Sequence, residues 1–233
     1  MIVSLTIIRY RKTLVPFALL AMAIHRVYMR SQKGCTFWRL MGSGREGTFS
    51  LNPDWQQWGL LAAWNSRDDF DTFYSSSRVS KWWDKFAAEK WTVLCSPLQS
   101  HGKWDEQEPF GKVNEPIPDG PVAILTRATI RFNRLKNFWG HVEETSALMN
   151  RSPGYILSFG IGELPFYRQA TFSVWQSMEH VKRFAYGSKE HAEVIRKTRE
   201  ENWYSEELFA RFRLLESFGT INGKDPLQGK IQS

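Results

Sequence analysis

The sequence predicts an α+β fold, in which two ferredoxin-like βαββαβ repeats are fused in one chain as a dimeric α+β barrel-like architecture. Three observations lead to this prediction. The chain has 233 residues, 42% hydrophobic and 24% charged, which is typical of a soluble globular protein. The same order of strands and helices occurs on both sides of a proline-rich segment. Short sequences also recur at matching places in that order, as expected for a diverged internal repeat.

Residues 1–96 form the first predicted repeat. Residues 2–10 are almost continuously apolar and rich in β-branched side chains, which indicates a buried strand. The most apolar run, residues 14–24, is shorter than the roughly 20 residues that cross a bilayer, so it is predicted to lie in a core-facing helix. The remaining predicted elements are strands at 34–44, 56–64 and 91–95, with helices starting near 66 and 79.

Residues 97–120 are predicted to be a linker, because four prolines alternate there with polar and acidic residues. Residues 121–218 form the second predicted repeat, and residues 219–233 a polar tail. A constant spacing separates Trp64 from Trp175 and Phe73 from Phe184. One ferredoxin-like sheet leaves one face uncovered by helices, so the two repeats are expected to bring their open faces together.

Charge and cysteine content exclude several classes of function. The net charge is +7, but the basic residues are dispersed and no nucleic-acid motif accompanies them, which argues against a nucleic-acid partner. Attraction to an anionic membrane surface is compatible with this charge.

Two cysteines far apart form no zinc or disulfide pattern, which favours a reducing compartment. We therefore expect a cytoplasmic protein with the option of peripheral contact at the inner membrane surface. P-loop, nucleophile-elbow and dinucleotide motifs are absent.

A single histidine distinguishes the two repeats. Counted from Phe73 and Phe184, the same position holds Ser80 in the first repeat and His191 in the second. Ser188 is a suitable helix N-cap, and the helix that it begins would place His191 on one face with Val194 and Ile195. The imidazole is either a core histidine bonded to a backbone carbonyl or the axial ligand of a haem, which needs one strong protein ligand.

Other charged and aromatic residues are weaker candidates. Arg196 and Arg199 either reach the haem propionates or form a solvated helix face. Arg127 and Arg199 are candidates for polarising bound oxygen. The rings of Trp38, Phe159 and Phe172 come from predicted strands whose inner faces are expected to line a substrate pocket.

Several short sequences are characteristic when taken together. In the second repeat they are LTRAT at residues 125–129, GIGELP at 160–165, TFSVW at 171–175 and EELFARF at 206–212. In the first repeat they are FWRL at residues 37–40 followed by Gly42 and Gly44, and WTV at 91–93. Through these strings the sequence resembles the spheroidene monooxygenase family of carotenoid biosynthesis over nearly its full length.

The resemblance implies a monooxygenase that oxidises the end of an acyclic carotenoid to a keto group by successive hydroxylations of one carbon. It also implies haem b as the cofactor, His191 as the iron ligand, and dioxygen and an electron donor as co-reactants. Two alternatives stay open at this point. One is another α+β barrel oxygenase acting on a smaller aromatic substrate, and the other is a non-catalytic haem- or lipid-binding protein.

Overall fold

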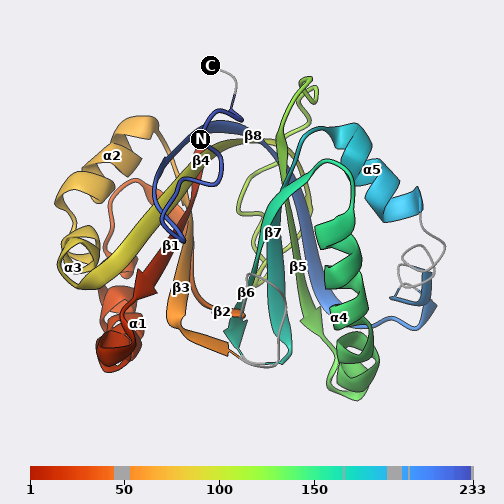
Figure 1. Cartoon of the computed structure of the whole chain (residues 1–233), viewed down its shortest axis with the longest axis horizontal. Helices are drawn as coiled ribbons and strands as arrows, with labels where there is room; N and C mark the ends of the chain where they lie inside the picture. The colour runs from red at the N-terminus through yellow and green to blue at the C-terminus, as the bar shows by residue number, and fades with distance from the viewer. Residues whose placement is uncertain (45–52, 165, 188–195, 199, 232–233) are drawn as a thin grey trace.

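A computed structural model describes residues 1–44, 53–164, 166–187, 196–198 and 200–231 of the chain. Within them, eight antiparallel strands close into one barrel, and the helices lie outside it in two groups (Figure 1). The expected α+β barrel is therefore confirmed. Every helix in this part of the chain falls short of the length and apolar content that a membrane span requires.

The first half of the chain supplies four strands and three α-helices. Their bounds are β1 (Ile2–Tyr10), the 3-10 helix η1 (Lys12–Leu14), α1 (Val15–Arg30), β2 (Cys35–Gly44), β3 (Pro53–Trp64), α2 (Arg67–Ser76), α3 (Arg78–Phe86) and β4 (Ala87–Gly102). Ser66 and Ser77 cap α2 and α3, because their hydroxyls accept hydrogen bonds from the backbone N–H of Asp69 and Ser80. The sequence predicted these elements, except for the length of β4.

The second half supplies the other four strands. Their bounds and those of the helices are β5 (Val122–Ile130), the 3-10 helix η3 (Phe132–Arg134), α4 (Leu135–Arg151), β6 (Tyr155–Leu164), β7 (Arg168–Trp175), α5 (Met178–Gly187) and β8 (Tyr204–Gly219). The order around the barrel is β1-β3-β2-β6-β7-β5-β8-β4. The first half therefore runs β4-β1-β3-β2, and the corresponding strands of the second half follow in the reverse order, β6-β7-β5-β8. A common origin of the two halves stays a prediction.

The barrel interior is one continuous hydrophobic core. Alternate residues of all eight strands point into it, among them Leu5, Leu61, Phe172 and Phe212. The two sheets thus bury their helix-free faces against each other, as the sequence predicted.

Segments outside the predicted repeats also enter this core. Trp104 and Phe110 come from the predicted linker and Leu227 from the predicted tail, and all three are buried among the inward-facing strand residues. The predicted linker also begins inside a strand, because β4 continues to Gly102, where it pairs with Leu208 of β8. Residues 97–120 therefore contribute to the barrel as well as connecting its halves.

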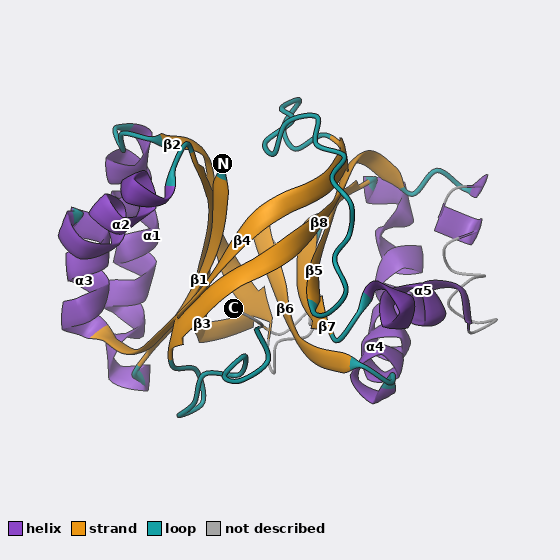
Figure 2. Ribbon diagram, turned by 90° about the horizontal axis from the view of Figure 1, so that it is seen from above, coloured by secondary structure: helices purple, strands orange, loops and turns teal. Residues whose placement is uncertain are grey.

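The two groups of helices cover the outer faces of the barrel on opposite sides (Figure 2). On the first half, α1, α2 and α3 pack over a dense aromatic cluster that includes Trp64, Phe70, Phe73 and Trp83. On the second half, α4 and α5 cover a smaller cluster built around Ile124, Met149 and Trp175. The two outer faces thus differ in how completely apolar side chains fill them.

Candidate functional site

The interior of the barrel is packed with side chains. Phe159 and Phe172 are register partners on β6 and β7, and both belong to the barrel core. Trp38 lies on the other side of the barrel wall, partly buried in the outer cluster beneath α1. The structure therefore brings Phe159 and Phe172 together but separates Trp38 from them. Contact of any of the three with substrate stays a prediction.

The hairpins β2–β3 and β6–β7 can be compared residue by residue, because they have the same register. Trp38 pairs with Ala62 and Leu40 with Leu60 in the first hairpin. In the second, Ser158 pairs with Ser173 and Gly160 with Thr171. Each hairpin also has an irregularity at its open end, where Trp64 and Trp175 occupy equivalent positions. The outward-facing positions of the two halves therefore correspond one to one.

Three bulky outward-facing side chains of the first half are replaced by small or polar residues in the second half, and an alanine is replaced by a serine. Trp38 corresponds to Ser158, and Leu40 corresponds to Gly160. Leu60 corresponds to Thr171, and Ala62 corresponds to Ser173. At these positions the second half therefore has less side-chain volume, whereas Tyr155 is larger than its counterpart Cys35.

Neighbouring elements show the same difference. Thr6 of β1 is completely buried, and its hydroxyl bonds to that of Thr92 at 3.0 Å. Its equivalent on β5, Thr126, is exposed. We call Thr126, Ser158, Gly160, Thr171 and Ser173 the small-residue face. It is the candidate site for a bound molecule.

Apolar side chains surround the small-residue face. Val122, Ile124, Met149, Trp175 and Val181 are buried next to it and come from β5, α4, β7 and α5. The surroundings are therefore an apolar wall with hydroxyl groups at its centre, an arrangement common in binding sites for small molecules and cofactors.

A half-buried tyrosine adds a polar group to this wall. The hydroxyl of Tyr155 lies 2.8 Å from that of Ser158, and burial raises the pKa of Tyr155. The phenol therefore stays protonated at neutral pH. It can donate or accept a hydrogen bond, because either oxygen can be the donor in the pair.

His191 and Arg199 lie outside the described residues, so their predicted roles stay predictions. The described residues that follow them, Glu201 and Trp203, contact η3 and α4. Glu201 accepts hydrogen bonds from Arg134 and Asn137, each at 3.2 Å. Trp203 stacks on His141 with ring centres 5.8 Å apart. Among the described residues, α5 therefore ends before these two positions, and the residues that follow them contact η3 and α4.

Arg196 is described and lies on the surface. Its guanidinium forms an ion pair with Glu200 at 2.6 Å, and both side chains are more than half exposed. Such an exposed pair contributes little to stability.

Arg127 points into the barrel, away from the small-residue face. Its side chain is 1% exposed and forms an ion pair with Glu206. A second carboxylate, that of Asp105, lies 3.6 Å from its Nη2 and also accepts from Arg39 and Arg168, at 2.7 and 3.0 Å. These residues, with Glu163 and Trp104, form a charged cluster at one mouth of the barrel.

This charged cluster fixes the start of the predicted linker. Burial raises the pKa of the Glu206 carboxyl. Hydrogen bonds from the backbone N–H of Glu106 and Asp105, together with the charge of Arg127, lower this pKa by a larger amount, so that it lies below its usual value. Glu206 is therefore ionised at neutral pH and compensates the buried guanidinium. The structure thus gives Arg127 a structural partner, while its predicted contact with oxygen stays a prediction.

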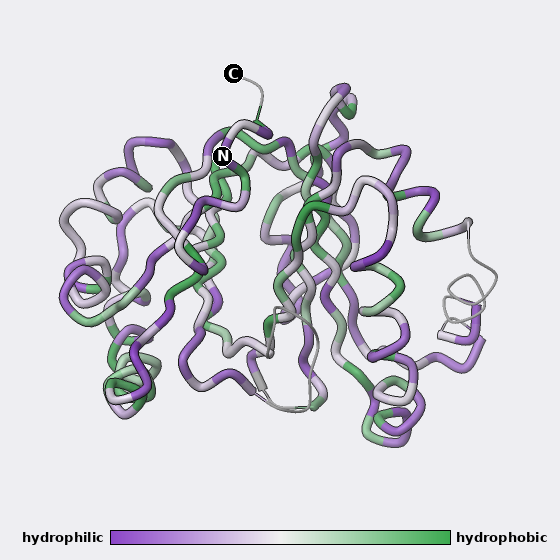
Figure 3. The backbone as a smooth tube through the Cα atoms, in the orientation of Figure 1, coloured by the Kyte–Doolittle hydropathy of each residue, from purple (hydrophilic) through white to green (hydrophobic). Residues whose placement is uncertain are grey.

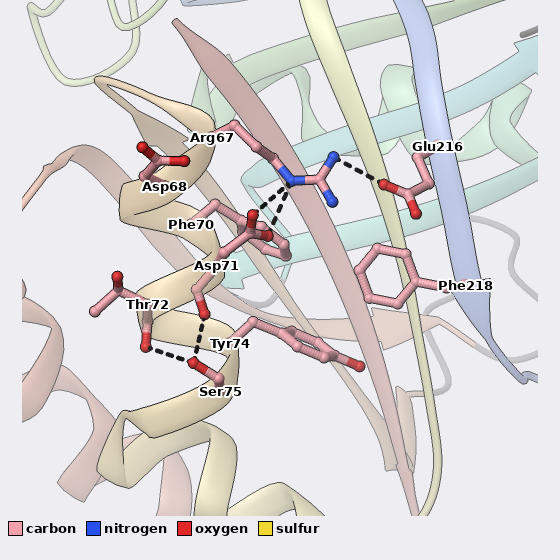
Figure 4. Close-up of a pocket in the computed structure, with 9 residues that line it drawn as sticks. All are labelled: Arg67, Asp68, Phe70, Asp71, Thr72, Tyr74, Ser75, Glu216 and Phe218. Atoms are coloured by element: carbon pink, nitrogen blue, oxygen red, sulfur yellow. Dashed lines mark hydrogen bonds and ion pairs between the residues drawn. The ribbon is translucent and has the colours of Figure 1, made fainter.

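A surface hollow of about 580 Å³ lies on the first half, between α2 and β8 (Figure 4). Arg67 reaches across it to Asp71 and Glu216, at 2.9 and 2.8 Å. Arg67 faces three carboxylates there, those of Asp68, Asp71 and Glu216, and none of the predicted site residues lines the hollow. The hollow is therefore a weaker candidate than the small-residue face.

Comparison with known proteins decides the family. Spheroidene monooxygenase of Rhodobacter capsulatus is 36% identical over 233 residues, which cover 99% of this chain and 97% of that protein. The chain belongs to the spheroidene monooxygenase family. This confirms the resemblance seen in the sequence and the expected enzyme class, an oxidoreductase of the monooxygenase type.

Other relatives agree with this assignment. Spheroidene monooxygenase of Cereibacter sphaeroides is 36% identical over 207 residues, 88% of this chain, which spans 64% of that protein. The enzyme of Rubrivivax gelatinosus is 34% identical over 194 residues, covering 83% of this chain and 74% of that protein. Residues 122–212 also match a family described as a domain of unknown function, DUF3291.

Solved structures resemble the fold of this family member. An aldoxime dehydratase crystallised with butyraldoxime has a TM-score of 0.64, with 11% identity, and the match covers 98% of this chain and 84% of that one. A second aldoxime dehydratase structure has a TM-score of 0.61 with 10% identity, covering 98% and 86%. At this identity the likeness concerns the fold alone.

Sequence analysis missed the small-residue face. The signal was present in the repeat, because aligning the segments around Trp64 and Trp175 places Leu60 and Ala62 opposite Thr171 and Ser173. Comparing every equivalent position of the two hairpins, and not the position of His191 alone, would have located the small-residue face.

Proposed function

We propose that the chain is a haem-dependent monooxygenase that oxidises the end of an acyclic carotenoid to a keto group, with haem b bound at the small-residue face. The observation that carries this proposal is the replacement of Trp38, Leu40 and Leu60 by Ser158, Gly160 and Thr171 at register-matched positions. A flat cofactor needs a wall without large side chains. Of the two halves, the second has small or polar residues at these positions.

The residues of the chain have distinct roles in this proposal. His191 would ligate the iron, while Arg196 and Arg199 would pair with the propionates. The apolar wall formed by Ile124, Met149 and Trp175 excludes water from the cofactor. Haem b, when bound, supplies the activation of dioxygen, with electrons from a separate donor. The protein binds and orients the carotenoid end and protects it from side reactions.

The carotenoid substrate is supported by the names of the relatives, which act on spheroidene. Apolar surroundings suit a hydrocarbon chain, which offers few groups for hydrogen bonding. The Tyr155–Ser158 pair lies beside the proposed site and supplies a hydroxyl that can bind an oxygen introduced into the substrate.

The iron ligand is tested by spectroscopy of the purified protein reconstituted with haem. We expect a Soret band that His191→Ala removes or strongly shifts. His141→Ala is the matched control, because His141 is another imidazole of the second half, stacked on Trp203. An unchanged spectrum in His191→Ala would eliminate this ligand.

The location of the cofactor is tested by restoring the first-half residue. Ser158→Trp is expected to lower haem affinity at least about tenfold by filling the proposed space, while Ser158→Ala keeps it near the wild-type value. Circular dichroism checks that both variants fold. Equal haem affinity in the two variants would place the cofactor elsewhere.

The reaction is tested by substrate-dependent oxygen uptake and product analysis. An acyclic carotenoid of the lycopene type should give a ketone, and a small polyketide-type aromatic should not react. Haem binding without oxygen uptake for any substrate would instead indicate a non-catalytic haem-binding protein.

A further inference from the structure

Helix α1 is apolar on both its buried and its outer side. Ala18, Ala21, His25 and Met29 face the core. The outer side carries Phe17, Leu19, Leu20 and Val27, which are 41%, 46%, 49% and 61% exposed. A surface helix normally has a polar outer side, so an apolar one indicates a second apolar environment.

The fold does not require these apolar residues. Helix α4 occupies the same position in the second half, since β1 and η1 precede α1 at the same spacing at which β5 and η3 precede α4. At the positions of Phe17, Leu20 and Val27, α4 has Asn137, Gly140 and Ala147, and of the four outer residues Leu19 alone has a large apolar counterpart, Trp139. Figure 3 shows the contrast, because α1 is drawn largely in green while α4 includes purple segments. The outer side of α1 is therefore specific to the first half.

Basic side chains surround this apolar surface. Arg11, Lys12, Arg26 and Arg30 are exposed at the two ends of α1. None of them forms an ion pair with a carboxylate within the described part of the chain. The first 45 residues contain no acidic residue at all. The neighbouring α3 adds Lys81 and Lys85, which are also exposed.

We infer that the outer side of α1 docks on the surface of an anionic lipid bilayer. An exposed apolar helix face bordered by unpaired cations matches the interfacial helices that insert their apolar side at the level of the lipid headgroups. A second copy of the chain fits less well, because a symmetric dimer through α1 would bring the same cations against each other. The inference rests on this surface and does not depend on the proposed cofactor.

Vesicle flotation tests this docking. The purified protein is mixed with vesicles of phosphatidylcholine containing 30% phosphatidylglycerol, or of phosphatidylcholine alone. We expect binding to the anionic vesicles, weakened at least about fivefold without phosphatidylglycerol and reduced by salt.

Variants locate the surface. Replacing Leu20 and Val27 together by glutamine should lower binding to anionic vesicles at least about tenfold. The matched control is Ala147→Gln, at the exposed position of α4 equivalent to Val27. Thermal unfolding checks that both variants fold, as expected for exposed positions. Absence of vesicle binding by the wild type, or equal binding by the double variant, would overturn the inference.

Light scattering without lipid tests the alternative that a second copy of the chain covers the outer side of α1. A dimer that Leu20→Gln/Val27→Gln converts to a monomer would show that a second copy covers α1, and it would also overturn the inference.

Discussion

The two outer faces of the barrel have the same strand register but opposite fillings. The first face is closed by Trp38, Leu40 and Leu60, which pack under α1 to α3 and leave near His25 a cavity of about 10 Å³, roughly the room for one water. The second face presents Ser158, Gly160 and Thr171 at the same positions. The comparison shows that one scaffold carries bulky apolar side chains on one outer face and small or polar residues at the same positions of the other, where we propose that the cofactor binds.

The charged mouth of the barrel gives the largest expected effect on stability. Arg127 of β5 occupies the position that Ile7 occupies on β1, and Arg127→Met would leave Glu206 and Asp105 without their buried cation. We expect a loss of about 4 kcal/mol in the free energy of unfolding, measured by urea titration. The matched control is Arg183→Met, which breaks an exposed pair with Glu179 and should change stability by about 0.5 kcal/mol or less. Equal effects of the two variants would show that the cluster is not structural.

Exchanging equivalent residues between the faces tests the comparison directly. Leu60→Thr should cost about 3 kcal/mol, because it removes buried apolar volume and buries a hydroxyl. The reverse change, Thr171→Leu, should alter stability by only about 1 kcal/mol if the second face has room. Chemical denaturation measures both, with Leu20→Thr as the exposed control. A Thr171→Leu variant as unstable as Leu60→Thr would mean that the second face is filled.

The smallest expected effect is a pH dependence confined to the first face. His25 lies between Trp82 and Trp83, and burial lowers its pKa from 6.5 to about 4. As the pH decreases, the unfolded chain therefore binds a proton at His25 at a higher pH than the folded chain does. The stability that neutral His25 contributes is fully present above pH 6.5 and is lost as the pH decreases toward 4. Between pH 7 and pH 5 the loss should be about 2 kcal/mol.

Comparing unfolding at these two pH values in wild type and His25→Met isolates this contribution. Between pH 7 and pH 5, the free energy of unfolding of the variant should fall by about 2 kcal/mol less than that of the wild type. Parallel pH profiles would show that His25 titrates normally.

Sequence patterns predicted much of the barrel, because most strands alternate or run apolar and most helices have clear starts. The spacing between Trp64 and Trp175 also located the second hairpin. What failed depends on long-range contacts. The extension of β4 to Gly102 follows from pairing with β8, and Trp104 is buried only because the barrel mouth lies above it. The direction of Arg127 likewise depends on the strand register, which a single sequence does not contain.

The closure of the barrel has a consequence for biosynthesis. The first half emerges from the ribosome with β2 and β4 as open sheet edges, since their partners β6 and β8 are synthesised later. Among the described residues, the seam between β2 and β6 joins only Gly42 and Ser43 to Gly162 and Ile161, whereas β4 and β8 pair along most of their length. A nascent chain with two free edges is prone to pair with other chains. Chaperone binding during synthesis should therefore peak before β8 leaves the ribosome.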